Sequence, residues 1–262
     1  MSLTDGQVRD LGAALHAARD SGTPIAPLTE AHPAMDMADA YRVQQDLVGR
    51  LLAGGDRIVG YKLGLTSTPM QQMLGVDSPD FAPVLAGHVH QDGAEIAVED
   101  FIWPRVEAEI ALVLSADLAG PDCTAVDAAR AVGGAVAAIE IVDSRIRDWK
   151  IKLADTIADL ASSGAIVLGS NAVPTAALDL RLIGMAFTRD GELVATGAGA
   201  AALGSPLAAV AWLANTLHTV GDSLKAGQFV MTGALHAALD ITAGQQFRAE
   251  FDRLGPVGLR VV

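Results

Sequence analysis

Two acids head the apolar run Glu107-Ala108-Glu109-Ile110-Ala111-Leu112-Val113-Leu114. A second run, Ala135-Val136-Ala137-Ala138-Ile139-Glu140-Ile141-Val142, contains Glu140 as its only charge. Short apolar runs of this kind are typical of buried strands, and neither contains a lysine or an arginine. Burying an unpaired carboxylate is strongly unfavourable, so acids inside such runs are usually paired or bound to metal. We therefore expect a sheet whose centre carries an acidic site.

The spacing of these acids indicates what the site could bind. Glu107 and Glu109 are two residues apart, which on a strand places both side chains on one face, roughly 7 Å apart at Cα. Glu140 would have to join them from a neighbouring strand. Three carboxylates suit Mg²⁺ or Mn²⁺, which prefer oxygen ligands and octahedral geometry. The alternative is a pair of solvated strand acids with Glu140 in an ion pair, and the spacing leaves both interpretations open.

Composition restricts the class of protein. The 262 residues fit one large domain or a domain with a helical appendage, and 51% hydrophobic residues allow a sizeable core. A net charge of −13 argues against nucleic acid or an anionic membrane as partner. The single Cys123 excludes an intrachain disulfide and a cysteine-cluster metal site.

The sequence also bears on cellular location. The N-terminus has no signal-peptide pattern, so we expect a cytoplasmic protein. Residues 193–221 lack charged side chains and are long enough to span a bilayer. Gly197, Gly199 and the Gly204-Ser205-Pro206 turn interrupt them, which favours a buried segment of a soluble protein.

The periodicity predicts an α+β fold, with a helical N-terminal part (1–56) and a strand-rich mixed β body (57–262). Thr4 or Asp5 could cap a first helix, residues 24–33 read as a loop, and Asp36 could cap a second helix ending at Gly54-Gly55. Further helices are expected over 124–132 and from Ser205-Pro206 to about Gly221. Strands are expected over 58–63, 108–114, 135–142, 165–168, 182–189, 229–232 and 246–251.

Other polar residues in or beside these strands are candidates for chemistry. A buried Lys62 would need an anionic partner, either a side chain or a bound substrate acid, although a surface lysine fits equally well. Asp80 fits a turn-capping acid in a loop. Arg145, near the acid strand, could orient a substrate carboxylate by a bidentate contact. Ser162-Ser163-Gly164 and Thr232-Gly233-Ala234 are small-residue turns of a kind that also binds carboxylates and carbonyls.

Several motifs together resemble the 2-hydroxypenta-2,4-dienoate (2-oxopent-4-enoate) hydratases and their sister 4-oxalocrotonate decarboxylases, in the fumarylacetoacetate hydrolase superfamily. The resemblance runs from about residue 58 to the C-terminus and, more weakly, through the helical part. The motifs that carry it are Gly60-Tyr61-Lys62-Leu63-Gly64-Leu65-Thr66-Ser67, Leu74-Gly75-Val76-Asp77, Pro79-Asp80-Phe81, Pro104-Arg105-Val106-Glu107-Ala108-Glu109-Ile110-Ala111, Ile139-Glu140-Ile141-Val142-Asp143-Ser144-Arg145-Ile146, Thr196-Gly197-Ala198-Gly199-Ala200-Ala201-Ala202-Leu203-Gly204-Ser205-Pro206 and Trp212-Leu213-Ala214-Asn215.

The resemblance implies roles for individual residues. It implies a fumarylacetoacetate hydrolase C-terminal-like body in which Glu107, Glu109 and Glu140 hold Mg²⁺ or Mn²⁺. Lys62 and Asp80 would be acid/base or substrate-orienting groups, and the pocket would be lined by Leu65, Ser162, Thr232 and Gly233. One departure is Leu160, at a position where the family commonly has Asn, and it puts the choice of substrate in doubt.

The implied reaction is hydration of a 2-hydroxy-2,4-dienoate to a 4-hydroxy-2-oxo acid in aromatic meta-cleavage catabolism. The sister decarboxylases tend to have an apolar residue at the position of Asp80, so Asp80 favours the hydratase, as Trp149-Lys150-Ile151-Lys152 does more weakly. Alternatives are a 4-oxalocrotonate-type decarboxylase, an acylpyruvate C–C hydrolase, or a non-catalytic partner in complex with a sister decarboxylase. The resemblance further implies a homo-oligomer.

Overall fold

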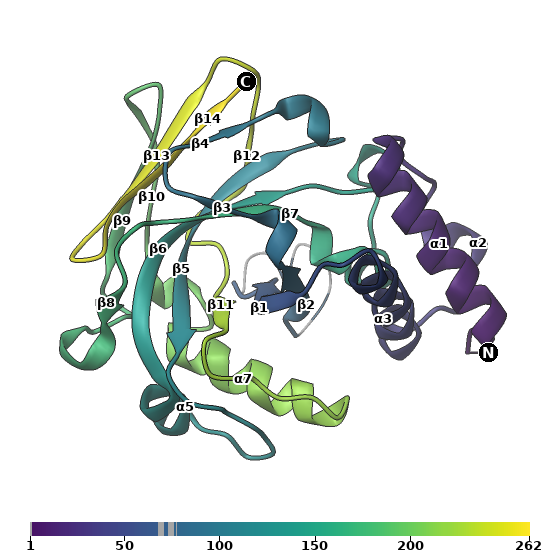
Figure 1. The fold of residues 1–262 in the computed structure, drawn as a ribbon, viewed down its shortest axis with the longest axis horizontal. Helices are drawn as coiled ribbons and strands as arrows, with labels where there is room; N and C mark the ends of the chain where they lie inside the picture. Colours follow the sequence, from purple (N-terminus) through teal and green to yellow (C-terminus); the bar gives the residue numbers. More distant parts are fainter. Residues whose placement is uncertain (1, 68–70, 73–75, 77) are drawn as a thin grey trace.

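The computed structural model describes residues 2–67, 71–72, 76 and 78–262. Two β-sheets form the body, and helices lie at one end of it and beneath it (Figure 1). This arrangement confirms the expected α+β class with a helical N-terminal part and a mixed β body. Leu74, Gly75 and Asp77 of the motif quoted above lie outside the described residues.

The first sheet has nine strands in the order β2-β1-β11-β5-β6-β7-β3, with β12 paired to β5 and β8 to β6. It is mixed, because β1–β11 and β3–β7 run parallel and the other pairs run antiparallel. Its strands are β1 (Ile58–Gly64), β2 (Asp80–Leu85), β3 (Val89–Gln91), β5 (Arg105–Leu114), β6 (Val132–Val142), β7 (Ser163–Leu168), β8 (Val173–Pro174), β11 (Phe229–Met231) and β12 (Leu239–Asp240).

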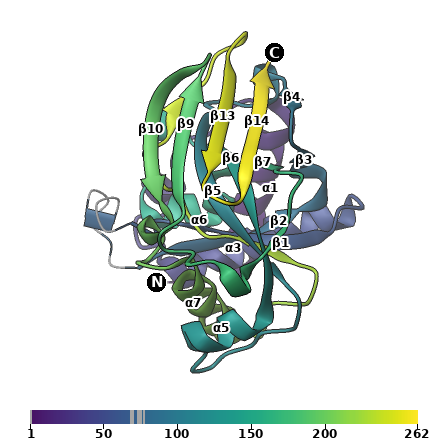
Figure 2. The ribbon, with the colours of Figure 1, turned by 90° about the vertical axis from the view of Figure 1, so that its left-hand side faces the viewer.

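The second sheet has five strands in the order β10-β9-β13-β14-β4, and it faces the viewer in Figure 2. Its strands are β4 (Ala94–Ile96), β9 (Gly184–Arg189), β10 (Glu192–Ala198), β13 (Gln246–Phe251) and β14 (Gly255–Val261). Phe187 and Phe247 from this sheet join Ile110 and Leu112 of β5 in the main hydrophobic core. The even-numbered side chains of β5 from Ala108 onward therefore face the second sheet and the core.

The two longest helices begin at N-cap residues that the sequence indicated. They are α1 (Asp5–Ser21), α2 (Leu28–Ala31), α3 (Met37–Ala53), α5 (Ala125–Ala131), α6 (Leu153–Ala158) and α7 (Pro206–Thr219). Thr4 forms a capping box with Gln7, and the Asp36 side chain accepts from the Asp39 N–H, as expected of N-cap residues. Reading residues 24–33 as a loop is wrong for its middle, which forms the short α2.

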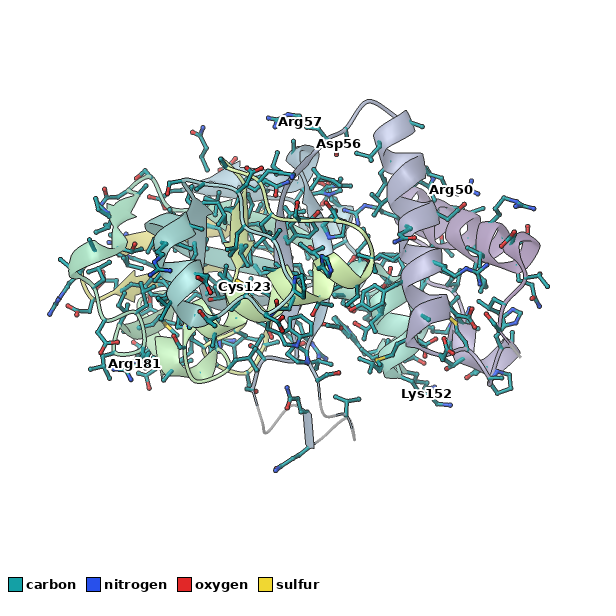
Figure 3. All side chains as sticks on the ribbon, turned by 90° about the horizontal axis from the view of Figure 1, so that it is seen from below. Arg50, Asp56, Arg57, Cys123, Lys152 and Arg181 are labelled. Carbon is teal, nitrogen blue, oxygen red and sulfur yellow. The ribbon has the colours of Figure 1, made fainter. Side chains whose placement is uncertain are left out.

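The N-terminal helices share a hydrophobic cluster with α6 and with the body. Leu15 of α1 and Leu47 of α3 pack in this cluster, which also contains Ala82 of β2 and the side chain of Leu160. Figure 3 shows Arg50 on the helical side of the molecule and Arg181 at the opposite end. The helices thus cover β2 and the segment around Leu160. A boundary between separate domains at residue 56 stays a prediction.

Helix α7 ends the apolar segment singled out in the sequence. Residues 199–219 are the one stretch of the described chain that is long and apolar enough to cross a bilayer. Val210, Leu213 and Leu217 of α7 are at most 1% exposed and belong to the main core. The helix therefore packs as a core helix of the folded body, as the interrupting glycines predicted.

Candidate active site

The pairing of β5 with β6 brings the three acids together. Glu107 lies directly opposite Glu140 in the antiparallel register, and Glu109 follows two residues along β5 on the same face. This face is the one that Ala111, Val136 and Ala138 share, opposite to the face that packs on the second sheet. One carboxylate oxygen from each acid lies within 4.8 Å of the others. The convergence expected from the spacing is therefore observed.

The acids are deeply buried and short of partners. Glu109 and Glu140 are fully buried, and Glu107 is partly buried. Oε2 of Glu109 accepts the Gly233 N–H at 2.8 Å, but its Oε1 and both oxygens of Glu140 accept no hydrogen bond from the described residues. Buried polar atoms are normally satisfied, and a bound cation would give these oxygens the partner that they lack. Lys62 Nζ forms an ion pair with Oε1 of Glu140 at 3.4 Å but no hydrogen bond.

The protonation of the acids follows from this burial. Burial raises the pKa of Glu107 to about 7, and the charge of Glu140 adds to the rise. Burial also raises the pKa of Glu109 well above its usual range, with further contributions from Glu140 and Glu107. In the protein without a cation, Glu107 is therefore partly protonated near neutral pH, because burial and the like charge of Glu140 both disfavour its carboxylate.

Lys62 supplies a positive charge beside the acids. It points from β1 into the same region, where Nζ lies 3.4 Å from Oε1 of Glu140 and donates to the Ala161 carbonyl at 2.8 Å. Burial works against the ammonium, but Glu140, Asp80 and Glu109 outweigh it and raise the pKa of Lys62. One ammonium cannot neutralise the four surrounding carboxyl groups, those of the three glutamates and of Asp80. The site can therefore still bind a cation.

Asp80 begins a strand and is not a turn cap in a loop, which corrects the expectation from sequence. It is the first residue of β2, paired with Gly64 of β1. A Cβ at Gly64 would collide with Oδ1 of Asp80, so glycine at this position leaves room for the carboxylate. Oδ1 has no hydrogen-bond partner among the described residues, and burial raises the pKa of Asp80 although Lys62 opposes the rise.

A cavity of about 450 Å³ opens onto these groups. Lys62, Asp80 and Glu107 line it together with Leu65 and Ser162, as the resemblance implied. Leu65, Trp149, Ala161 and Ser162 all line the cavity with φ between +48° and +56°. Such backbone conformations are unfavourable for non-glycine residues and cluster at functional sites. The left-handed backbone at these four positions of the cavity wall must therefore be stabilised by contacts with the rest of the fold.

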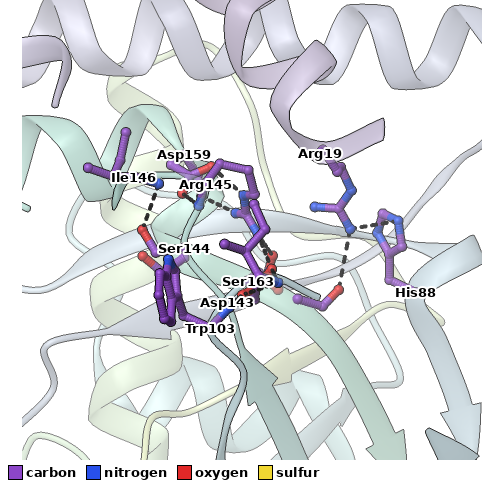
Figure 4. A network of polar contacts seen from close by, with 12 residues as sticks. Arg19, His88, Trp103, Asp143, Ser144, Arg145, Ile146, Asp159 and Ser163 are labelled. Carbon is purple, nitrogen blue, oxygen red and sulfur yellow. Dashed lines mark hydrogen bonds and ion pairs between the residues drawn. The ribbon is translucent and has the colours of Figure 1, made fainter. Parts of the chain in front are cut away.

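Three residues expected to touch substrate do not line the cavity. Arg145 is 2% exposed, and its guanidinium donates to the Asp159 side chain at 2.6 Å and to the carbonyls of Asp159 and Ser163 (Figure 4). Thr232 Oγ1 donates to the Ile110 carbonyl, and the Gly233 N–H donates to Glu109. The structure thus gives Arg145 a supporting place behind the cavity wall, and gives Thr232 and Gly233 places that support the acid strand.

Leu160 also lies behind the wall. Its side chain is 2% exposed and packs in the cluster with the N-terminal helices, outside the cavity lining. Its φ is +54°, a conformation that asparagine tolerates better than leucine. The departure from the family pattern therefore changes packing and backbone preference at this position and leaves the described cavity surface unchanged.

Some lining residues were not identified from the sequence. Arg105 lies over the ring of Trp149 at 4.8 Å, and its Nε donates to Asp240 at 2.8 Å. Thr156 Oγ1 lies 3.1 Å from Ser162 Oγ. His236 lines the cavity from the segment between β11 and β12. No spacing pattern in the sequence identifies these residues. Arg105 is a partial exception, because it lies two residues before Glu107 on β5 and therefore shares a face with Glu107 and Glu109.

The donor set fits a divalent cation. The three carboxylates form an all-oxygen site, with unpartnered buried oxygens on Glu109 and Glu140, and oxygen is the ligand type of hard divalent ions. A cation held by Glu107, Glu109 and Glu140 would satisfy these oxygens and remove the repulsion among them. The cavity beside this site is large enough for a small organic acid, and Lys62 and Asp80 are among the residues that line it.

Comparisons with known proteins show what this chain is similar to. The family model described as fumarylacetoacetate (FAA) hydrolase C-terminal matches residues 58–262. The 2-keto-4-pentenoate hydratase of Paraburkholderia xenovorans (strain LB400) is 44% identical over 255 residues, which cover 97% of this chain and 95% of that protein. The 2-hydroxyhexa-2,4-dienoate hydratase of Comamonas testosteroni is 39% identical over 251 residues, 95% of each protein.

A solved structure is similar over the whole chain. The 4-oxalocrotonate decarboxylase from Pseudomonas putida G7, complexed with magnesium and adipate, superposes with a TM-score of 0.97 at 36% identity. The match covers 100% of this chain and 99% of that one.

Proposed function

The chain belongs to the fumarylacetoacetate hydrolase C-terminal family, and from that premise we propose that it is a metal-dependent hydratase. It adds water to a 2-hydroxy-2,4-dienoate of the 2-oxopent-4-enoate type and gives a 4-hydroxy-2-oxo acid, a step of aromatic meta-cleavage catabolism. The observation that carries the proposal is the convergence of Glu107, Glu109 and Glu140 beside a cavity that Glu107, Lys62 and Asp80 line. The relatives named as hydratases match nearly the full length of the chain, which supports the same reaction here.

We assign Glu107, Glu109 and Glu140 as ligands of Mg²⁺ or Mn²⁺. The magnesium in the related decarboxylase structure supports a divalent ion of this kind. When bound, the cation supplies Lewis acidity toward the carboxylate and the 2-oxygen of the substrate. The Gly233 N–H fixes one oxygen of Glu109, and Lys62 balances part of the charge of Glu140.

The remaining chemistry is proton transfer. The dienol gives up its hydroxyl proton and gains one at C5, which leaves a 2-oxo acid with a double bond between C3 and C4. The oxygen of water then adds at C4, and a proton adds at C3, so one water is consumed. Asp80 suits the proton carrier, because burial raises its pKa and its Oδ1 is free of partners among the described residues. Lys62 suits a fixed cation that orients the substrate.

Ser162 and Leu65 are proposed to contact the substrate along the cavity wall. Arg145, Thr232 and Gly233 are proposed to act behind them, since their donors are engaged by Asp159, Ile110 and Glu109 respectively. These groups would keep the wall and the acid strand rigid, and rigidity of this kind is what precise positioning of a reactive group requires.

The principal alternative is decarboxylation of a 4-oxalocrotonate-type 2-oxo acid on the same metal. The 36% identity to a decarboxylase keeps this reaction in view, whereas relatives near 44% identity are named as hydratases. Hydrolysis of an acylpyruvate would need a base that activates water. His236, which lines the cavity, has both ring nitrogens on backbone groups and no carboxylate partner among the described residues, so it does not supply that base.

A non-catalytic partner of a sister decarboxylase is the remaining alternative. Its one basis in the sequence is that Leu160 replaces the Asn common in the family, and the Leu160 side chain lies outside the cavity lining, so the replacement gives this alternative little support. We also infer a homo-oligomer in the cytoplasm, and light scattering on the purified protein would give the number of subunits.

The test is a direct assay of the purified chain. With Mg²⁺ and 2-hydroxypenta-2,4-dienoate we expect loss of the dienol absorbance, no release of CO₂ from 4-oxalocrotonate, and no reaction in chelator. Glu140→Gln, which keeps the shape of the side chain, should lose the metal-dependent rate. Release of CO₂ without hydration would establish the decarboxylase instead, and a wild-type rate in Glu140→Gln would refute the metal assignment.

A further inference from the structure

One edge of β5, the strand that carries two of the acids, lacks a regular partner where those acids lie, although β6 pairs with its other edge. On one edge of β5, β11 pairs with residues 111–113 and β12 pairs with residues 105–106. Between these stretches the connecting segment bends away, and its residues 234–238 line the cavity. The backbone of Ala108, between Glu107 and Glu109, therefore faces an irregular segment and not a strand.

Two consecutive residues of that segment satisfy Ala108. The Leu235 N–H donates to the Ala108 carbonyl at 3.0 Å, as a strand neighbour would. The Ala108 N–H donates to Nε2 of His236 at 2.9 Å, so an imidazole takes the place of a strand carbonyl. Ala108 is fully buried, and without this acceptor its N–H would be unsatisfied.

The surroundings fix the tautomer of His236. The Ala108 N–H can only donate, so Nε2 must accept, while Nδ1 lies 2.7 Å from the Ala237 carbonyl, which can only accept. The ring is thus neutral with its proton on Nδ1, and its centroid lies 4.8 Å from that of the Phe187 ring in the second sheet, with the two rings tilted by 35°. Two hydrogen bonds and a ring contact hold the imidazole in one orientation.

We propose that His236 is a positioning residue of the metal site. By holding the backbone of Ala108, it fixes the positions of the neighbouring Glu107 and Glu109. Both ring nitrogens are engaged, so His236 takes no proton from substrate. Its effect on the reaction passes through the acid strand. The inference rests on the proposed function, because it gives the three acids their role as ligands.

The experiment measures Mn²⁺ binding by calorimetry on the full chain without substrate. His236→Gln retains an acceptor oxygen at about the reach of Nε2, and His236→Met has a similar length without one. Groups that orient metal ligands typically change metal affinity by about 10–100-fold when removed. We expect His236→Met to raise the Kd for Mn²⁺ about tenfold, and His236→Gln to stay within about threefold of the wild type. His218→Met, at an exposed position on α7, controls for loss of a histidine and should bind as the wild type does.

The outcomes separate the two proposals. No Mn²⁺ binding by the unsubstituted chain would overturn the proposed function itself. Binding by the wild type with an unchanged Kd in His236→Met, or with equal weakening in the Gln and Met variants, would overturn only the role of His236. If His236→Met does not fold, His236→Phe replaces it, since it keeps a ring against Phe187 and also lacks the acceptor.

Discussion

Asp80 and Lys62 line one cavity but differ in their readiness to exchange a proton. Burial raises the pKa of the Asp80 carboxyl, which brings it toward the pH at which a proton carrier works best. The acids around Lys62 raise its pKa and keep it charged, with Nζ donating to the Ala161 carbonyl. Pairs of groups whose surroundings separate their protonation in this way are commonly divided between acid–base and electrostatic roles.

Asp80→Asn tests this division. The amide keeps the size of the side chain but cannot carry a proton, so we expect kcat for dienoate hydration to fall about 10²–10⁴-fold. The Kd for Mn²⁺ should change little, because Asp80 is not among the three converging acids. Steady-state kinetics and calorimetry give the two values. A variant with the kcat of the wild type would show that Asp80 does not carry the proton.

Gly233 is a residue at which backbone conformation and the acid site meet. Its φ is +110°, a Cβ would collide with the side chain of Thr66, and its N–H donates to Glu109. We expect Gly233→Ala to lower the free energy of unfolding by about 1–2 kcal/mol for the left-handed backbone and about 1–3 kcal/mol more for overpacking. Denaturant unfolding measures the loss, and calorimetry should show weaker Mn²⁺ binding.

Gly244→Ala is the matched control for that change. Gly244 has a similar φ of +93°, but a Cβ there would meet open space. It should show only the backbone part of the loss and bind Mn²⁺ as the wild type does. Equal destabilisation in the two variants would mean that the contact with Thr66 is relieved easily and that Gly233 is not a special constraint on the site.

The sequence predicted the acid trio better than the groups that support it. Glu107, Glu109 and Glu140 were recognisable because a charge in an apolar run has few explanations, and the register of β5 and β6 brings them together. Arg145 looked equally suited to bind a carboxylate, yet it is engaged by Asp159, fourteen positions later. Which acid a buried arginine meets depends on the path of the chain between them, and no local pattern records that path.

At the scale of elements, strands with alternating or continuous apolar residues were predicted and others were not. β14 contains Gly255, Pro256 and Gly258, and β2 contains Pro83, residues that argue against a strand interior. β2 lies at the edge of the first sheet, where proline is tolerated. β14 pairs with β13 from Gly255 to Arg260, so tertiary pairing outweighs local propensity in that strand.

The junction of α1 with the body is held by a partly buried polar contact. Nη2 of Arg19, near the end of α1, lies 2.8 Å from Nε2 of His88 and also donates to the Gly164 carbonyl. Burial lowers the pKa of Arg19 to about 10 and, together with the charge of Arg19, lowers the pKa of His88 to about 4. At neutral pH, His88 is therefore an uncharged acceptor for a charged arginine.

Arg19→Met tests the strength of that junction. It removes the donor and leaves His88 Nε2 and the Gly164 carbonyl without it, so we expect about 1–3 kcal/mol less stability in denaturant unfolding. Arg9→Met, at an exposed position on the same helix, should stay within about 0.5 kcal/mol of the wild type. Indistinguishable stabilities of the two variants would mean that apolar packing alone docks α1.

At the scale of the whole molecule, the fold encloses mutually repelling acids that a bound cation would relieve. Two sheets, the helical cluster and the left-handed turns of the cavity wall keep Glu107, Glu109 and Glu140 together even without an ion. This preorganisation stores an unfavourable interaction in the metal-free protein. Metal binding should therefore raise the thermal midpoint of unfolding, Tm, by an amount that depends on pH.

The sign of that linkage follows from Glu107. Its pKa is raised from 4.5 to about 7 in the folded metal-free protein, so its contribution to stability is fully present below pH 4.5 and is lost as pH rises through about 7. Metal binding requires the deprotonated acids and stabilises the fold by mass action. The rise in Tm caused by a fixed excess of Mg²⁺ should therefore be larger at pH 8 than at pH 5.5.

Taking the difference between metal-loaded and metal-free samples at each pH cancels the opposite contribution of His88, whose lowered pKa makes stability fall as pH drops from 6.5 toward 4. Glu107→Gln should show a smaller rise in Tm and a weaker dependence on pH in scanning calorimetry. A metal-induced rise that is equal at both pH values in the wild type would mean that Glu107 does not bind the ion.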